Sequence, residues 1–212
     1  SATYRQSSRT GPDLQSRDPA NILLARQSGL RFSSEQVRDS ILFASGLLSR
    51  KLGGPSVRPP QPDSVVIEGF ENKWVLSGGE DRHRRGLYTF IQRTSPFAQG
   101  VTFDAANAGR TCTRRERSNT PLQALTLLND PVFFEAAQAM ALRILHENEG
   151  DDTERIDFAF QLCLSRVPGP TERERLLAYL QEQREIFKDD PQAVDAIVSE
   201  RTEGPDKHQW AA

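Results

Sequence analysis

Apolar side chains recur with helical spacing over two stretches of the chain. In the first, Ser33 stands three residues before Gln36, as in a capping box, and Phe32 lies where it can pack on Val37 as a hydrophobic staple. The apolar positions that follow are Val37, Ile41, Leu42, Ala44, Leu48 and Leu52. The pattern therefore predicts a helix that begins after Ser33 and ends before the glycines and proline of residues 53–55.

The second stretch begins at Thr120 and predicts a set of helices. Thr120 is a suitable N-cap, and Gln123 can return a hydrogen bond to it. Pro121 fits the first helical position, because the backbone N–H that proline lacks has no partner within the helix there. Further helix starts are expected at Asp130, at Asp151, at Thr171 with Glu174, and at Asp190. The connections are short, which predicts antiparallel neighbours in a helical bundle.

The intervening chain breaks the helical period. Residues 53–62 read GGPSVRPPQP, and their prolines favour an extended strap. Residues 65–67 and 100–104 are predicted to be short extended pieces, whereas residues 86–91 suit either a strand or a short buried helix. Residues 1–32 have no sustained period and are predicted to be an arm or loop.

The predicted architecture is mainly α, a helical bundle with a long proline-rich, partly extended central segment. At 212 residues the chain is long enough for one domain with a real core. We assign residues 1–32 to the arm and residues 33–212 to a single mainly helical domain, with the bundle starting at residue 120. Because the chain opens with Ser1 rather than Met, we expect it to be an excerpt or a processed product.

Composition narrows the class of protein. Hydrophobic residues make up 36% and charged residues 26%, and the mean hydropathy is -0.59, which predicts a large wetted surface. Apolar runs fall far short of the roughly 20 residues that cross a bilayer, so no membrane span is expected. The net charge of -2 and the lack of aromatic residues among the basic residues 81–85 argue against nucleic-acid binding.

The charge is unevenly distributed. Residues 82–117 carry eight basic and two acidic side chains, a net of +6, whereas residues 118–212 carry nine basic and eighteen acidic ones, a net of -9. Of 27 basic residues 23 are arginine, which favours fixed, forked hydrogen bonds over loose solvation. Two interpretations are open: the arginines form internal ion pairs with the acidic helices, or they form an anion-binding surface.

The candidate ligand site is the polar run of residues 112–119, which leads into the helix at Thr120. A helix N-terminus carries unpaired N–H groups and a partial positive charge, and the nearby arginines strengthen its attraction for a carboxylate, sulfate or phosphate. The candidate ligand-binding residues are Arg114, Arg115, Arg117, Asn119 and Thr120. Structural pairing of these arginines with acidic neighbours is the alternative.

Cysteine and histidine offer little further chemistry. Cys112 and Cys163 do not form a C-x-x-C motif, and they are expected either as one disulfide or as two buried thiols. The three histidines are too scattered to predict a metal site, and we expect no metal or cofactor in this chain.

Several segments together carry a resemblance to a known family. They are residues 38–40 (RDS), 53–57 (GGPSV), 84–90 (RRGLYTF), 102–105 (TFDA) and 112–125 (CTRRERSNTPLQAL). The chain resembles the C-terminal domain of large planctomycete proteins that often begin with a cytochrome-c-like region, domain of unknown function 1553. The resemblance implies an exported protein, periplasmic or secreted, with haem in an upstream domain. It supplies no catalytic residue.

Two functions follow as hypotheses. The first is a non-catalytic binding or interaction module of an exported multidomain protein, whose partners are other domains of the parent chain and an anionic small molecule or acidic polysaccharide. The second is a catalytic domain that acts on polysaccharide or on a redox partner, with Asp104 or Glu116 in a cleft formed by the central segment.

Overall fold

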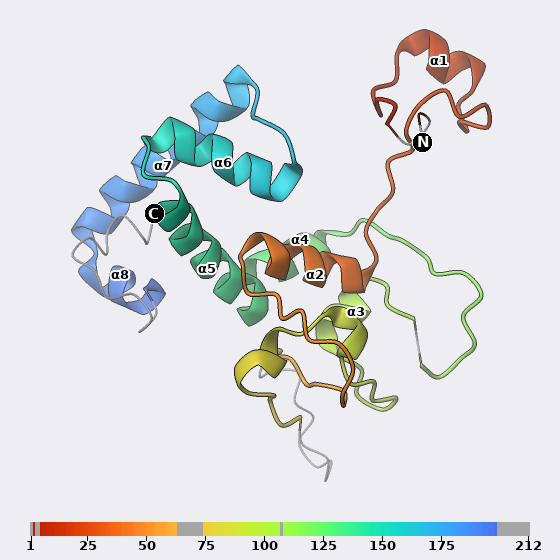
Figure 1. Cartoon of the computed structure of the whole chain (residues 1–212), viewed down its shortest axis with the longest axis horizontal. Coiled ribbons are helices and arrows are strands. Elements are labelled where there is room, and N and C mark those ends of the chain that lie inside the picture. Colours follow the sequence, from red (N-terminus) through yellow and green to blue (C-terminus); the bar gives the residue numbers. More distant parts are fainter. Residues whose placement is uncertain (1, 3–4, 63–73, 107, 199–212) are drawn as a thin grey trace. The chain divides into compact units, whose positions relative to one another are not determined.

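The computed structural model describes residues 2, 5–62, 74–106 and 108–198. The chain divides into two compact units, Ser1–Phe32 and Ser33–Ala212. In its described residues the regular structure consists of eight α-helices and two 3₁₀-helices, with two isolated β-bridges and no strand. The prediction of a mainly α fold is confirmed (Figure 1).

The first unit contains a short helix, α1 (Pro12–Arg17), followed by a turn. The carboxylate of Asp18 accepts hydrogen bonds from the amides of Ile22 and Leu23, both at 2.8 Å. Asn21 occupies the turn with a φ of +54°. The segment predicted as an arm or loop therefore has a small local structure, held by side-chain hydrogen bonds to its own backbone.

The second unit begins with α2 (Ser34–Ala44), which starts where the sequence predicts. The Gln36 amide donates to Ser33 Oγ at 3.4 Å, and the Ser33 amide donates to Gln36 Oε1 at 2.9 Å. These two contacts are the predicted capping box, and they satisfy two amides that a helix start would otherwise leave unpaired. The start of α2 is thus fixed by residues within one turn.

The end of α2 differs from the prediction. The helix stops at Ala44, although apolar residues continue at helical spacing to Leu52. Ser45 Oγ donates to the Leu42 carbonyl at 3.1 Å, and Gly46 has a φ of +80°. This left-handed conformation is easily reached only by glycine and commonly ends helices, so it outweighs the apolar spacing that follows.

The central segment is held by scattered backbone contacts. The proline-rich strap of residues 53–62 contains no helix; it opens with a bend at residues 53–55, and Val57 pairs with Thr89 through an isolated parallel bridge. Two 3₁₀-helices follow, η2 (Gly79–His83) and η3 (Gly86–Tyr88), so residues 86–91 form neither the strand nor the buried helix considered. The predicted extended run at residues 65–67 lies outside the described residues.

Residues 100–104 are not extended as predicted: residues 100–102 are helical and residues 103–104 form a turn. The helical part belongs to α3 (Ala98–Thr102), whose C-cap is Phe103, and Thr102 Oγ1 donates to the Ala98 carbonyl at 3.1 Å. Phe103 is buried edge-on against Phe133, with ring centroids 6.2 Å apart. The β-branched and aromatic residues that suggested a strand are therefore placed by packing, which overrides their local propensity.

The helical body follows in the predicted order. Its helices are α4 (Pro121–Asn129), α5 (Pro131–Glu147), α6 (Asp152–Leu164), α7 (Pro170–Asp189) and α8 (Pro191–Ile197). The predicted caps Asp130, Asp151 and Asp190 each accept a backbone N–H at 2.9 Å. The start of α7 is corrected, because Pro170 takes the first helical position and the Gly169 amide donates to Glu172 Oε2 at 2.8 Å. Thr171 is thus inside the helix.

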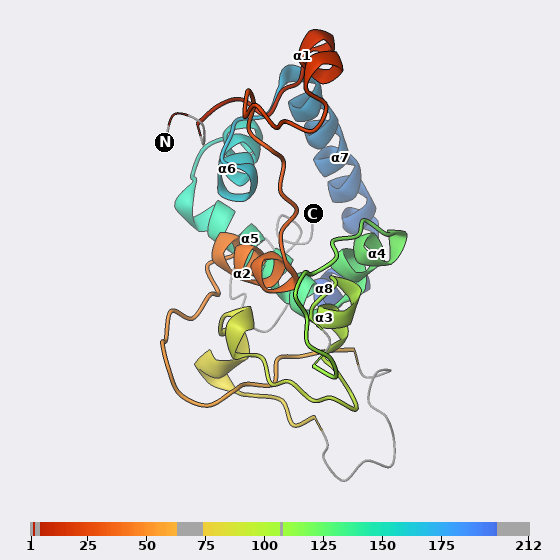
Figure 2. The ribbon, with the colours of Figure 1, turned by 90° about the vertical axis from the view of Figure 1, so that its right-hand side faces the viewer.

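The apolar core of the second unit is small and lies around α2 and α5. Figures 1 and 2 show α2 with α5 and α6 on one side and the mostly irregular chain of residues 45–62 and 74–97 on the other. The buried apolar residues are Leu42, Ala44, Val57, Phe103, Val132, Phe133, Ala136 and Val194. Helices α6 and α7 contain no fully buried residue, and bidentate ion pairs join them, Arg173 to Asp157 and Arg184 to Asp152.

Candidate functional site

The polar run of residues 112–119, here called the arginine segment, enters α4 through a hydrogen-bonded junction. Gln123 lies at its centre and is only 2% exposed. Its Nε2 donates to the Thr102 carbonyl at 3.0 Å and to Ser118 Oγ at 3.1 Å, while its Oε1 accepts from the Thr120 amide at 3.4 Å. The predicted return bond from Gln123 to the helix cap is confirmed.

Asp104 supplies the negative charge at this junction. Its Oδ2 accepts from the Ser118 amide and from Ser118 Oγ, both at 2.7 Å, and from Gln123 Nε2 at 3.4 Å. The Asp104 backbone has a φ of +57°, a left-handed conformation that Asp tolerates better than most residues. A carboxylate of the chain itself therefore lies next to the helix start where an external anion was predicted.

The five candidate ligand residues have different environments. Arg115 Nη1 donates to both oxygens of Glu35, at 2.8 and 2.7 Å, which ties the arginine segment to the first turn of α2. Thr120 is half-buried as the cap of α4. Arg114, Arg117 and Asn119 are exposed and make no hydrogen bond or ion pair with the described residues. The pairing interpretation therefore applies to Arg115, whereas Arg114 and Arg117 have no acidic partner among the described residues.

The two candidate catalytic carboxylates are not brought together in an enclosed site. Asp104 Oδ2 already accepts three hydrogen bonds at the junction. Glu116 is exposed on the arginine segment and contacts no described partner. A general acid or base needs a carboxylate oxygen that faces the substrate, and the Asp104 oxygen used here faces the backbone.

The cysteines differ from both expected arrangements. Cys112 and Cys163 are free and exposed, so they form neither the disulfide nor the buried pair. Cys163 Sγ lies 3.4 Å from Met140 Sδ, where α6 meets α5. Cys112 lies at the start of the exposed arginine segment. The physical reason is that Cys163 packs against Met140 of α5, whereas Cys112 lies in a separate, exposed segment.

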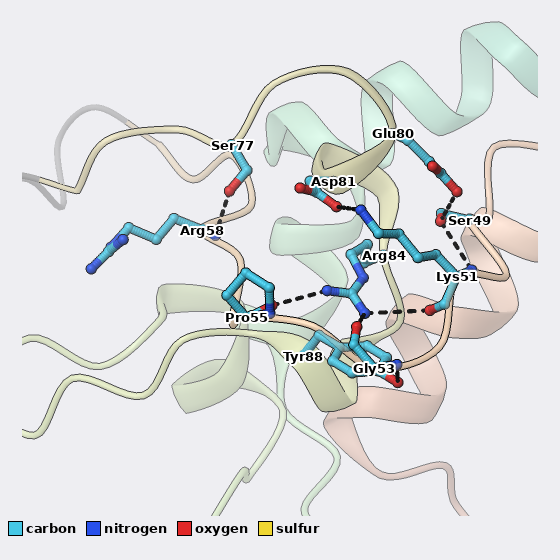
Figure 3. A network of polar contacts seen from close by, with 10 residues as sticks. All are labelled: Ser49, Lys51, Gly53, Pro55, Arg58, Ser77, Glu80, Asp81, Arg84 and Tyr88. Atoms are coloured by element: carbon cyan, nitrogen blue, oxygen red, sulfur yellow. Dashed lines mark hydrogen bonds and ion pairs between the residues drawn. The ribbon is translucent and has the colours of Figure 1, made fainter.

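The second basic run, residues 81–85, has a structural role that the sequence did not indicate. Arg84 is 1% exposed, and Figure 3 shows its guanidinium enclosed by the turn that leads into the strap. Its Nη1 donates to the Pro55 carbonyl at 2.9 Å, and its Nη2 donates to the carbonyls of Lys51, at 3.3 Å, and Gly53. The guanidinium also lies 3.6 Å from the centroid of the Tyr88 ring. We call this arrangement the Arg84 cage.

A second buried arginine, Arg38 of α2, binds the same basic run. Its Nη2 donates to the Arg82 carbonyl at 2.9 Å and its Nε to the Arg84 carbonyl at 3.4 Å. Burial lowers the pKa of Arg38 to about 10. Beside it, Arg85 Nε donates to Asp39 Oδ2 at 3.0 Å. The main chain and side chains of the basic run are therefore attached to α2. These contacts indicate that the run stabilises the fold.

Helix α5 contributes the partner of the remaining two basic residues. Glu135 accepts from Arg82 Nε at 3.0 Å and shares a 3.0 Å hydrogen bond with His83 Nε2. The hydrogen bond with His83, followed by that from Arg82, lowers the pKa of Glu135 to about 2 even though burial acts in the opposite direction. The ionised Glu135 thus joins α5 to the central segment.

This pairing predicts a specific loss of stability in acid. The folded pKa of Glu135 is about 2, below its ordinary value of 4.5, so its contribution is complete above about pH 4.5 and is lost as the pH falls toward 2. We expect Glu135→Gln to lower the free energy of unfolding at pH 7 by about 2–3 kcal/mol. Urea unfolding at pH 7, 4.5, 3 and 2 should show this difference shrinking below pH 4.5.

The matched control is Glu147→Gln, also on α5, where an exposed carboxylate pairs with Arg143 four residues earlier. Exposed pairs of this kind contribute about 0.5 kcal/mol, so this variant should unfold like the wild type. Equal stability of Glu135→Gln and wild type at pH 7 would contradict the assigned role of Glu135.

One face of α4 is apolar and exposed. Leu122, Leu125 and Leu128 are 67%, 54% and 74% exposed, and their spacing places them along one side of the helix. The opposite side carries the buried Gln123 and faces α3 and α5. A helix that leaves such a stripe uncovered directly after the arginine segment presents apolar and basic groups together, a combination typical of interaction surfaces.

Across residues 2, 5–62, 74–106 and 108–198, no group of three or more His, Cys, Asp or Glu side chains is arranged to hold a metal ion. None of the helices in these same ranges has the length and apolarity needed to cross a membrane.

Comparison with known proteins identifies one match. A family model described as PSD1, protein of unknown function (DUF1553), matches residues 1–180. No curated protein and no solved structure matches the chain.

Proposed function

The chain belongs to the PSD1 family of proteins of unknown function (DUF1553), and we propose that it is a binding or interaction module that holds an anionic partner on the arginine segment. One observation carries the proposal. Arg114 and Arg117 are exposed without a described carboxylate partner, whereas Arg82, Arg85 and Arg115 of the same +6 region are paired.

The junction beneath the segment supports this role. Ser118, Gln123 and Asp104 hold the chain directly after Arg117, so the exposed guanidinium groups stand on an anchored backbone. Guanidinium presents forked N–H donors that match carboxylate and sulfate oxygens. Asn119 adds an exposed amide donor at the same end. The expected ligands are therefore a carboxylate-bearing or sulfated molecule, such as an acidic polysaccharide.

The contacts of Asp104 and Glu116 favour binding over catalysis. A catalytic domain would need one of these carboxylates in a cleft, and Asp104 serves as an acceptor for the backbone while Glu116 is exposed beside arginines. We keep the wider setting as part of the proposal: an exported multidomain protein with haem in an upstream domain, as the family resemblance implies. Other domains of that protein are then natural partners.

The proposal predicts that Arg114→Ala/Arg117→Ala weakens binding of a sulfated polysaccharide at least tenfold. Each guanidinium contributes a charge-assisted contact, and a tenfold loss corresponds to about 1.4 kcal/mol. Isothermal titration with heparin at low and moderate salt measures it, and the wild-type affinity should fall as salt rises.

Arg175→Ala is the matched control, because Arg175 is an exposed arginine of α7 that also lacks a described ion pair. Its affinity for heparin should stay within about twofold of wild type. Arg115→Ala should also weaken binding, since it frees the negative charge of Glu35 beside the site. Unchanged affinity in the Arg114→Ala/Arg117→Ala variant would refute the proposal.

A further inference from the structure

The exposed leucines of α4 lie next to the arginine segment, so a surface complementary to both would combine apolar side chains with acidic groups. Leu122, Leu125 and Leu128 form the apolar stripe, and Arg117 lies just before the N-terminal end of the helix. The N-terminus of a helix also carries a partial positive charge. A complementary surface therefore has exposed apolar side chains along a short length of helix and acidic groups at one end.

The outer face of α7 has this composition. Tyr179 and Ile186 are 57% and 51% exposed, and helical spacing puts them on the same side as Glu182. Asp189, seven residues after Glu182, lies on this side as well, and both carboxylates are exposed. Neither Glu182 nor Asp189 makes an ion pair with the described residues.

The lengths of the two faces agree. From Leu122 to Leu128 the rise is about 9 Å, and from Tyr179 to Ile186 it is about 10 Å. With Leu125 opposite Glu182 and the helices antiparallel, Arg117 approaches the exposed Asp189 at the C-terminal end of α7. In a parallel arrangement Arg117 would meet the exposed Arg175 instead. The charges and the helix dipoles both favour the antiparallel arrangement.

We propose that the partner of this face is a second copy of the chain, with α4 and Arg117 of one copy docked on the outer face of α7 of the other. The inference rests on the proposed function, because it names an acidic partner for the arginine segment. The faces are small, so the association is weak, with a dissociation constant on the order of 100 μM.

Sedimentation velocity of the full chain at low salt tests this over about 10–500 μM, a range around that dissociation constant. The wild-type average mass should rise with concentration. Leu125→Asp, Arg117→Glu and Asp189→Arg should each weaken association at least tenfold, whereas Arg117→Glu/Asp189→Arg should restore it. Leu87→Asp, at a still more exposed apolar residue of η3, should associate like wild type.

Any of three results overturns the inference. The wild-type chain stays monomeric over this range, the Leu125→Asp variant associates as strongly as the wild type, or the Arg117→Glu/Asp189→Arg double variant fails to recover association. Heparin binding separates this result from the proposed function, since Asp189→Arg leaves Arg114 and Arg117 intact. A chain that binds heparin but does not self-associate refutes only the second-copy partner. A chain that self-associates as described but does not bind heparin refutes the anionic-ligand proposal.

Discussion

Arg84→Ala should unfold with a free energy about 3–5 kcal/mol below that of the wild type. The guanidinium is buried and satisfies the carbonyls of Lys51, Gly53 and Pro55 while stacking on Tyr88. Removing it leaves those carbonyls without their donor and opens a cavity where the strap meets the end of α2. Urea unfolding at pH 7 measures the loss, and Arg84→Lys should recover less than half of it because one ammonium cannot bridge the same carbonyls.

Arg58→Ala is the matched control in the same strap. Arg58 also lies over an aromatic ring, 4.1 Å from the centroid of Phe90, but no backbone carbonyl accepts a hydrogen bond from its guanidinium among the described residues. A stacked cation of this kind contributes about 0.5–1 kcal/mol. If Arg58→Ala and Arg84→Ala destabilise the chain equally, the carbonyl contacts are not the source of the stability and the cage has been misassigned.

Asp104→Ala should lower the free energy of unfolding by about 3 kcal/mol, from two separate causes. The alanine must hold a left-handed backbone at φ +57°, which costs about 1–2 kcal/mol. It also leaves the Ser118 amide and the buried Gln123 without the carboxylate that accepts from them, which costs about 1–3 kcal/mol.

Two further substitutions at this position separate the causes. Asp104→Gly relieves the backbone strain but lacks the acceptor, so it should be more stable than Asp104→Ala by about 1 kcal/mol. Asp104→Asn keeps an acceptor oxygen and tolerates the left-handed backbone, so it should be the most stable of the three. Thermal and urea unfolding give the order, and an alanine variant as stable as the asparagine variant would contradict the junction described here.

Elements whose signals are local were predictable from sequence. The capping box at Ser33 and the caps Asp130, Asp151 and Asp190 each depend on residues within one helical turn, and all are present. Long-range contacts were not predictable in this way. Residues 100–104 form the end of α3 and a turn where an extended piece was predicted, because Phe103 packs on Phe133, thirty positions away in sequence, and no periodicity encodes that contact.

The position of the arginine segment directly before α4 was predictable, but the contacts within the junction were not. The arginine segment and its link to α4 follow from adjacency in sequence, whereas the use of Asp104 as the acceptor at the junction depends on how α3 meets α4. The Arg84 cage was missed because its acceptors are main-chain carbonyls, which leave no side-chain signature. The glycines at residues 53 and 54, with φ values of +74° and +88°, were the local signal of a turn there.

The segments by which the family was recognised supply these contacts. Asp39, Arg84 and Asp104 each come from one of them, and each makes a hydrogen bond that joins distant parts of the fold. Asp39, Arg84 and Asp104 therefore stabilise the fold. The proposed function instead uses Arg114 and Arg117, which are exposed and have no carboxylate partner among the described residues.

The most direct test of the binding role is to locate the ligand on the chain. Nuclear magnetic resonance of the ¹⁵N-labelled chain, titrated with a short heparin fragment, reports which residues respond. The account predicts shifts concentrated at Arg114, Arg117 and Asn119, with Arg84 and Arg173 unchanged because their guanidinium groups are already engaged. Shifts that spread evenly over the exposed arginines, or that cluster on α6 and α7 and spare the arginine segment, would contradict it.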